Sequence, residues 1–151
     1  MQQDPVLKMD ILIWRIFKLL TKNKKQILDS LGLTCSQFEI LSAIYYYSVF
    51  RTEIIQVDLS EKTEIDPMTT SIILRNLERK ELITRCRSTV NTRTVLVKLT
   101  EKGSELLKKA TMQIRLSCTK LYESIDKDKL TSQLLKLSEK LNSQSSKSLK
   151  V

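Results

Sequence analysis

Apolar residues recur at helical spacing along most of this 151-residue chain. In successive segments they fall three or four positions apart, so each segment can turn one face toward a core. Glycine or short polar stretches separate the segments. The pattern predicts helices over residues 6–30, 35–48, 54–64, 67–80 and 101–125, a break at 126–128, and a last helix over 130–141 followed by a frayed polar tail.

Polar residues stand where these helices should begin. Asp4 and Asp66 each precede a proline, and proline is favoured in the first turn of a helix. Thr34 and Gln37 have the spacing of a capping box, in which each side chain bonds the other residue's backbone N–H. Thr100 can cap the helix that follows it. The start positions are therefore predicted from local chemistry.

Two runs that contain β-branched residues interrupt the helical pattern. They cover residues 82–87 and 94–99, and the short polar stretch between them predicts a β-hairpin. With only two glycines and two prolines, the chain has few tight turns, which argues against a sandwich or barrel. We expect a mainly α fold with a small β-hairpin (α+β), as a single domain over residues 1–151.

The periodicity also predicts which side of a helix is buried. Val57 and Leu59 are the candidates on the helix over 54–64. On the helix over 67–80, the apolar or small residues at 70, 73, 74 and 77 should face the core. The opposite side of this helix then carries Met68, Ile72, Arg75, Asn76 and Arg79.

The helix over 6–30 has apolar residues on several sides, including Leu12, Ile13 and Ile16. A helix of this kind needs more than one partner. A second subunit is one economical way to supply it. The aromatic residues Trp14, Phe17 and 45–47 are interpreted as core and dimer packing.

Composition narrows the function. The formal charge is +9, which favours a polyanionic partner such as nucleic acid or an anionic membrane. There is no histidine, the usual general base and the commonest metal ligand. We found no nucleophile–base pair, phosphate-binding loop or metal-ligand cluster, so we expect no enzyme activity, no metal and no cofactor.

The three cysteines and the N-terminal segment indicate the compartment. Widely spaced cysteines in odd number favour a reducing cytosol. The apolar run over 11–20 contains Arg15 and Lys18 and is too short to span a bilayer. Asp4 and Asp10 stand where a signal peptide would be basic. The expected location is the cytoplasm, with no membrane partner.

The order of helices and hairpin over residues 34–100 is that of a winged helix-turn-helix. The major groove of DNA admits one α-helix, and a second helix braces it. The hairpin carries Arg85, Arg87, Arg93 and Lys98, with no acidic residue from 85 to 98. Such uncompensated charge is suited to phosphate or the minor groove, although a solvated ribbon would look the same.

The stretch from Leu31 to Ala110 resembles the MarR family of bacterial transcription regulators. The matching pieces are LTCSQFEILSAI, Q-x-D-L-S-E-K with IDPMT, LRNLERKELITR, and a closing N-T-R-T-x-L-V-K-L-TEKG-x-E-L-L. The resemblance implies a homodimer, held by dimerisation helices over 5–32 and 101–143, that binds pseudo-palindromic double-stranded DNA, in this case as a repressor. In many members a small phenolic ligand or cysteine oxidation releases DNA, so a small aromatic effector is a candidate partner.

Carried onto this chain, the resemblance assigns roles to residues. Met68, Thr69, Ser71 and Ile72 would contact bases, and Arg75 and Asn76 would lie nearer the backbone. Arg93 would enter the minor groove, with Arg85, Arg87 and Lys98 on phosphates. The dimer interface would use Leu7, Ile11, Trp14, Leu116, Leu121, Leu134 and Leu137.

The chain departs from the family pattern at four positions. Asn91 stands where the family commonly has aspartate, which puts the rigidity of the wing in question. Glu64 and Glu81 occupy turns where glycine is favoured, which suggests a different turn geometry. Ile72 replaces a polar or basic reader. It would contact a thymine methyl or pack on a neighbouring helix.

Two alternatives remain open. The same fold can serve as a protein-interaction module, and the apolar Met68 and Ile72 favour it. A redox-responsive regulator would use Cys35, at a helix N-terminus, or Cys86, between two arginines, since either setting favours a thiolate. Cys86 could instead be buried, because neighbours in a strand point to opposite faces. Cys118 is expected in the core.

Overall fold

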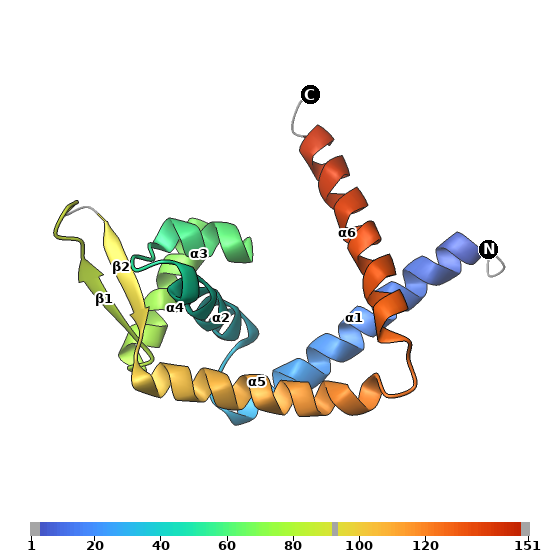
Figure 1. The fold of residues 1–151 in the computed structure, drawn as a ribbon, viewed down its shortest axis with the longest axis horizontal. Coiled ribbons are helices and arrows are strands. Elements are labelled where there is room, and N and C mark those ends of the chain that lie inside the picture. The colour runs from blue at the N-terminus through green and yellow to red at the C-terminus, as the bar shows by residue number, and fades with distance from the viewer. Residues whose placement is uncertain (1–3, 92–93, 149–151) are drawn as a thin grey trace. The chain divides into compact units, whose positions relative to one another are not determined.

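The computed structural model describes residues 4–91 and 94–148, which form helices and one hairpin (Figure 1). The elements in chain order are α1 Pro5–Ser30, α2 Cys35–Phe50, α3 Gln56–Thr63, α4 Pro67–Arg79, β1 Ile83–Arg87, β2 Val95–Leu99, α5 Glu101–Leu121 and α6 Lys127–Ser148. The predicted fold class and the order of elements are confirmed.

The predicted helix starts form the expected hydrogen bonds. The Val6 amide donates to the Asp4 carboxylate at 2.8 Å, and the Gly103 amide donates to Thr100 Oγ1 at 3.0 Å. Thr34 and Gln37 form the complete capping box. Each cap satisfies a backbone donor that a helix leaves unpaired at its start.

Several boundaries differ from the predicted ones, and the helix expected over 101–125 ends at Leu121. α2 continues two residues beyond the expected end, and α3 begins at Gln56 rather than at Ile54. Ile54 instead precedes the helix in an extended segment, where its carbonyl accepts from the Val97 amide at 2.8 Å. The predicted helix over 130–141 is wrong at both ends, because α6 starts at Lys127 and runs to Ser148. The carboxylate of Asp126 accepts a hydrogen bond from the Lys129 amide and so caps α6. Asp126, which was expected to lie in a break between helices, therefore marks the start of α6.

The hairpin is antiparallel, with Ile83 opposite Leu99 and Arg87 opposite Val95. A short bridge between Ile55 and Leu96 ties the segment before α3 to β2. This bridge gives the hairpin a third partner beside β2, which a two-stranded ribbon needs for stability in water.

The chain divides into two compact units, residues 1–114 and 115–151. The apolar core lies in the first unit, where α2 packs against α3, α4 and β2. Ile40, Leu41 and Ile44 of α2 are fully buried there. The second unit contains the end of α5 and all of α6. That both units belong to one domain stays a prediction.

The structure changes one prediction about the buried side of α3. Leu59 is buried, as expected, but Val57 is 56% exposed, so its predicted burial is wrong. α3 has only eight residues and turns just one side toward α2 and α4. Within the described residues, no single helix is long and apolar enough to cross a membrane. α1 and α2 reach that length and apolarity only as a pair, and the two helices are bent by 82° relative to each other.

Glu64 and Glu81 both adopt the left-handed backbone conformation, with φ of 56° and 60°. The expectation of a different turn geometry is therefore wrong, because these turns keep the conformation that glycine adopts most easily. The turn at Glu81 also brings Leu82 against α5, where a Cβ on Gly103 would lie 1.9 Å from the Leu82 carbonyl oxygen. Glycine is required at 103 by this close approach.

Replacing Glu64 with glycine should stabilise the protein. A left-handed conformation destabilises the folded state by roughly 1–2 kcal/mol at a non-glycine residue. Glycine removes this strain, but its more flexible unfolded chain lowers the free energy of unfolding by about 0.5–1 kcal/mol. We expect Glu64→Gly to raise the free energy of unfolding by about 0.5–1 kcal/mol, measured by urea denaturation at fixed protein concentration.

The matched control is Glu61→Gly, an exposed position inside the same helix. Glycine there should lower the free energy of unfolding by about 1 kcal/mol. Equal destabilisation by both variants would contradict the strain assigned to Glu64.

Candidate nucleic-acid interface

The four residues of α4 that were expected to face the core, Thr70, Ile73, Leu74 and Leu77, are buried. The other side is open. Met68 is 77% exposed and Ile72 is 52% exposed, and Arg75 and Arg79 are exposed further along the helix. Asn76 is half-buried, and its side-chain oxygen accepts a hydrogen bond from Arg79. The outward face thus begins apolar and ends cationic.

The start of α4 is held in place from two directions. The Thr69 amide donates to the Asp66 carboxylate at 2.9 Å, and hydrogen bonds from Thr69 keep the pKa of that carboxyl below its usual value. The cap is therefore intact at neutral pH and lost only as pH falls through the lowered pKa. From α3, the Gln56 amide group donates to the Pro67 carbonyl at 3.1 Å. These bonds set the position of the residues expected to contact bases.

The end of α4 is fastened to a distant part of the chain. Lys80 Nζ donates to the Gly32 carbonyl at 2.7 Å and to Gln37 Oε1 at 3.1 Å. Lys102 of α5 donates to the Lys80 carbonyl at 3.0 Å. The C-terminal end of α4 is thereby tied to the α1–α2 turn and to α5.

Arg85 on β1 forms a two-point contact with Glu78 on α4. Its Nε and Nη2 both donate to Glu78 Oε2, at 2.9 and 2.6 Å. The guanidinium is half-buried and its charge is matched by the carboxylate. A phosphate would have to compete with this pair, so the contact favours a positioning role for Arg85 between α4 and the hairpin.

The wing, defined as residues 83–99, exposes two of its predicted phosphate contacts. Arg87 and Lys98 are exposed on β1 and β2. The turn after β1 is held by the buried Ser88, whose hydroxyl accepts from the amides of Val90 and Asn91. The wing is therefore braced at Ser88. Arg93 lies outside the described residues, and its minor-groove contact stays a prediction.

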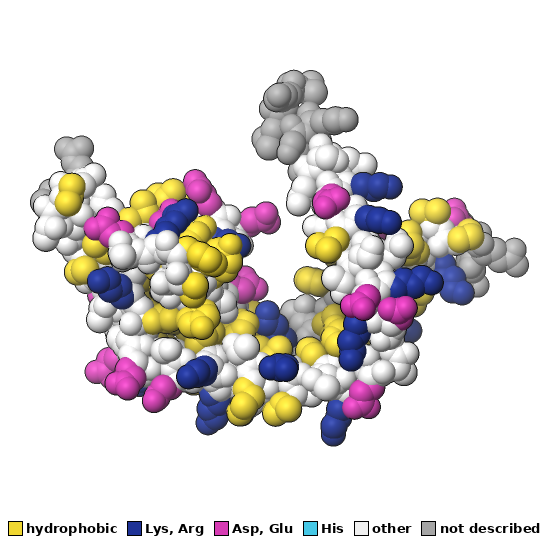
Figure 2. Space-filling model, viewed as in Figure 1, with side chains coloured by type: hydrophobic (Ala, Val, Ile, Leu, Met, Phe, Trp, Pro, Cys, Tyr) yellow, Lys and Arg dark blue, Asp and Glu magenta, His cyan; other side chains and the backbone are white. Residues whose placement is uncertain are grey.

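The residues predicted for the dimer interface are mostly open to solvent within the described chain. Trp14 is 63% exposed, and Leu137 is half-buried. Leu7, Ile11, Leu116, Leu121 and Leu134 are exposed. Hydrophobic side chains remain at the surface of both units (Figure 2). Apolar surface of this extent usually marks an interaction site.

The cysteines do not pair with one another. Cys35 is half-buried and packs against the core, and Cys86 is exposed on β1, so the reading of Cys86 as buried is wrong. Cys118 is half-buried rather than in the core. Among the described residues no group of three His, Cys, Asp or Glu side chains is placed to hold a metal ion.

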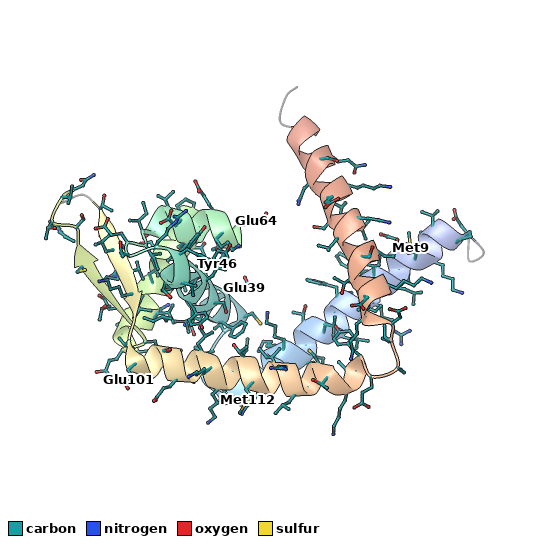
Figure 3. All side chains as sticks on the ribbon, viewed as in Figure 1. Met9, Glu39, Tyr46, Glu64, Glu101 and Met112 are labelled. Atoms are coloured by element: carbon teal, nitrogen blue, oxygen red, sulfur yellow. The ribbon has the colours of Figure 1, made fainter. Side chains whose placement is uncertain are left out.

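A groove of about 480 Å³ lies between α2 and the ends of α1 and α3. Figure 3 labels two of its lining residues, Glu39 and Tyr46, both on α2. Two lysines stand over aromatic rings at its rim: Lys24 Nζ is 5.0 Å from the Phe38 centroid and Lys62 Nζ is 4.1 Å from the Tyr46 centroid. The groove combines aromatic surface with two lysines and one carboxylate, that of Glu39.

Comparison with known proteins identifies the family. The family model for the transcriptional regulators SarA/Rot matches residues 22–110. The chain belongs to the SarA/Rot family of transcriptional regulators. The matched stretch contains α2, α3, α4 and both strands. The part of this SarA/Rot protein that matches the family model therefore includes the helices and the wing described above.

Individual relatives agree with the family match. The chain is 33% identical over 91 residues to the organic hydroperoxide resistance transcriptional regulator of Bacillus subtilis, a match that covers 60% of this chain and 59% of that relative. In structure it resembles the DNA complex of MepR from Staphylococcus aureus, with a TM-score of 0.77 and 23% identity over 93% of this chain and 99% of that one. The structure of this SarA/Rot protein is thus a MarR-type winged helix.

A second MepR structure is closer in sequence. A MepR mutant bound to an oligodeoxyribonucleotide is 26% identical, with a TM-score of 0.62 over 90% of this chain and 97% of that one. It shows that a regulator of this fold and this level of identity binds DNA.

Sequence reasoning did not find Glu78, Ser88 or Lys80. Glu78 and Lys80 act through partners in other elements, which no short spacing reveals in advance, whereas Ser88 bonds amides two and three residues ahead of it. The Glu78–Arg85 pair spans seven residues and the Lys80–Gly32 contact spans 48. The sequence signal that could have pointed to the pair is an acidic residue, Glu78, near the end of the helix that precedes Arg85.

Proposed function

We propose that this protein is a transcriptional repressor that binds double-stranded DNA as a homodimer on a pseudo-palindromic operator. The observation that carries the proposal is the outward face of α4, whose buried side is set by the core and whose exposed side ends in Arg75 and Arg79. The Arg85–Glu78 pair joins that helix to the basic wing. The family match and the DNA-bound MepR mutant support it.

In the proposed complex, α4 of each subunit enters one of two successive major grooves about 34–36 Å apart. Met68, Thr69, Ser71 and Ile72 face the bases, because they occupy the N-terminal half of α4. Arg75, Arg87 and Lys98 neutralise phosphates, and Asn76 lies beside the backbone. Arg93 reaches the minor groove. Arg85 is assigned a positioning role, because Glu78 already holds its guanidinium. The place of action is the cytoplasm, where bacterial DNA lies.

Homodimerisation is proposed through the exposed apolar surface of α1 together with that of α5 and α6. Large apolar side chains are exposed to water on several sides of α1 in a single chain. Covering this surface with a second copy would supply the burial that a stable dimer needs. A dimer also matches the two-fold symmetry of an inverted-repeat operator.

DNA binding should weaken steeply with salt. Arg75, Arg87 and Lys98 from two subunits give about six phosphate contacts, and each contributes about −0.9 to the slope of log K against log salt concentration. We expect a slope near −5 for the wild type in fluorescence anisotropy, and Arg87→Ala should make it shallower by about two because both subunits lose one contact.

Lys136→Ala on α6 is the matched control, since it removes an exposed lysine outside the proposed interface. It should leave the slope unchanged. Equal effects of the two variants would reject the wing assignment. Binding to a partner protein with little dependence on salt would favour the protein-interaction alternative.

A charge placed in the exposed apolar face of α1 should separate the subunits. Trp14→Glu would bury a carboxylate at the proposed interface, where an unpaired charge is strongly unfavourable. We expect the dimer mass of the wild type to fall to the monomer mass in sedimentation velocity. Lys8→Glu, an exposed charge reversal on the same helix, is the control and should stay dimeric. A wild type that sediments as a monomer would overturn the proposed dimer.

A small aromatic effector is proposed for the groove between α2 and the ends of α1 and α3. Its aromatic lining and the two lysines suit a planar ring that bears a carboxylate. Using salicylate as the probe in calorimetry, we expect Lys62→Ala to weaken binding at least tenfold and Lys22→Ala, exposed on α1, to leave it unchanged. Equal binding by wild type and Lys62→Ala would reject this site. The redox alternative at Cys35 or Cys86 stays a prediction.

A further inference from the structure

The first two turns of α4 lack the side chains that usually read bases. Residues 67–74 are PMTTSIIL and contain no Arg, Lys, Asn, Gln, Asp or Glu. Bidentate recognition of guanine requires Arg or Lys, and that of adenine requires Asn or Gln. The nearest such residue, Arg75, begins the cationic half of the helix. Discrimination by paired hydrogen bonds is therefore absent where α4 is expected to meet the bases.

The hydroxyl groups in this segment are partly engaged within the protein. Thr70 is fully buried and its hydroxyl donates to the Ile65 carbonyl at 3.2 Å. Thr69 is bound to the Asp66 cap through its backbone and side chain. These bonds stabilise the start of the helix. They leave the apolar side chains as the dominant feature of its outward face.

Met68 and Ile72 lie one turn apart on that face, as residues i and i+4 of the helix. They are 77% and 52% exposed, so Ile72 does not pack on a neighbouring helix, which was one of the two readings of this position. Isoleucine is also a poor choice for an exposed helix position on grounds of helix propensity. The apolar surface is therefore open to contact with a ligand outside the chain.

The surroundings identify the chemistry of that occupant. Arg75 and Arg79 follow on the same face, and the wing adds Arg87 and Lys98. An apolar spot flanked by positive charge fits a polyanion that presents an apolar group in a groove. In duplex DNA the major groove offers one such group, the C5-methyl of thymine.

We propose that Met68 and Ile72 read thymine C5-methyl groups, so that each operator half-site is specified by methyl contact rather than by bidentate hydrogen bonds. The inference rests on the proposed DNA binding and deepens it. It names the chemical group that α4 recognises and the two side chains that recognise it.

The test compares thymine with uracil, which pairs identically and lacks only the methyl group. The bound sequence is first selected from a random duplex pool with the full-length protein. Each thymine of the selected half-site is then replaced singly by uracil. We expect a loss of about fourfold in affinity per methyl contacted, the size expected for one buried methyl or methylene group. Uracil placed outside the half-sites should have no effect.

Two variants assign the effect to the side chains. In Ile72→Ala, the thymine–uracil difference should disappear at the position that Ile72 contacts, while Met68→Ala should abolish it at a neighbouring position. Arg87→Ala is the matched control and should weaken thymine and uracil duplexes equally. Circular dichroism checks that these exposed substitutions leave the helices intact.

The outcomes separate the two proposals. If uracil is tolerated at every position, or if its penalty persists unchanged in both alanine variants, methyl reading is overturned while DNA binding stands. If the wild-type protein binds no duplex containing thymine, the proposed function itself fails, and the methyl inference fails with it.

Discussion

Burial of one face of α4 is the constraint on which the rest of the structure depends. Leu74 and Leu77 are almost completely removed from water, and each buried leucine contributes about 1.5–3 kcal/mol. Since a helix advances 100° per residue, burial of one face places the residues of the opposite face toward the solvent. Core packing therefore decides which side chains α4 presents to a ligand, and the surface of this SarA/Rot protein that would meet DNA is a consequence of its interior.

Polar contacts then fix where that face points. The Glu78–Arg85 pair couples α4 to the wing, so the two elements expected to touch neighbouring grooves move together. Lys80, at the same end of α4, couples the helix to the turn between α1 and α2. Gly103 permits α5 to approach Leu82 at a distance that no side chain would allow. A shift of α1 or α5 would thus act on α4 through hydrogen bonds, which have directional geometry, as well as through packing.

The chain carries two kinds of exposed surface. Large exposed apolar side chains are most numerous on α1 and recur on α2, α5 and α6, whereas the arginines of the proposed interface lie on α4 and the wing. Apolar surface gains free energy by leaving water, and exposed positive charge gains it by releasing counterions from a polyanion. The first favours another copy of the chain, the second a nucleic acid. Met68 and Ile72 on α4, like Val90 in the wing, place apolar surface inside the cationic region.

Sequence alone determined what depends on neighbours within one or two helical turns. The caps at Asp4, Thr34, Asp66 and Thr100 and the buried side of α4 follow from short spacings, because the bonds and faces involved are local. Only the tertiary structure decided the partner of Arg85, the contact of Lys80 with Gly32, the exposure of Val57 and the left-handed backbone at Glu64. These depend on which elements pack together, and side-chain spacing along one segment carries no information about the segment it will meet.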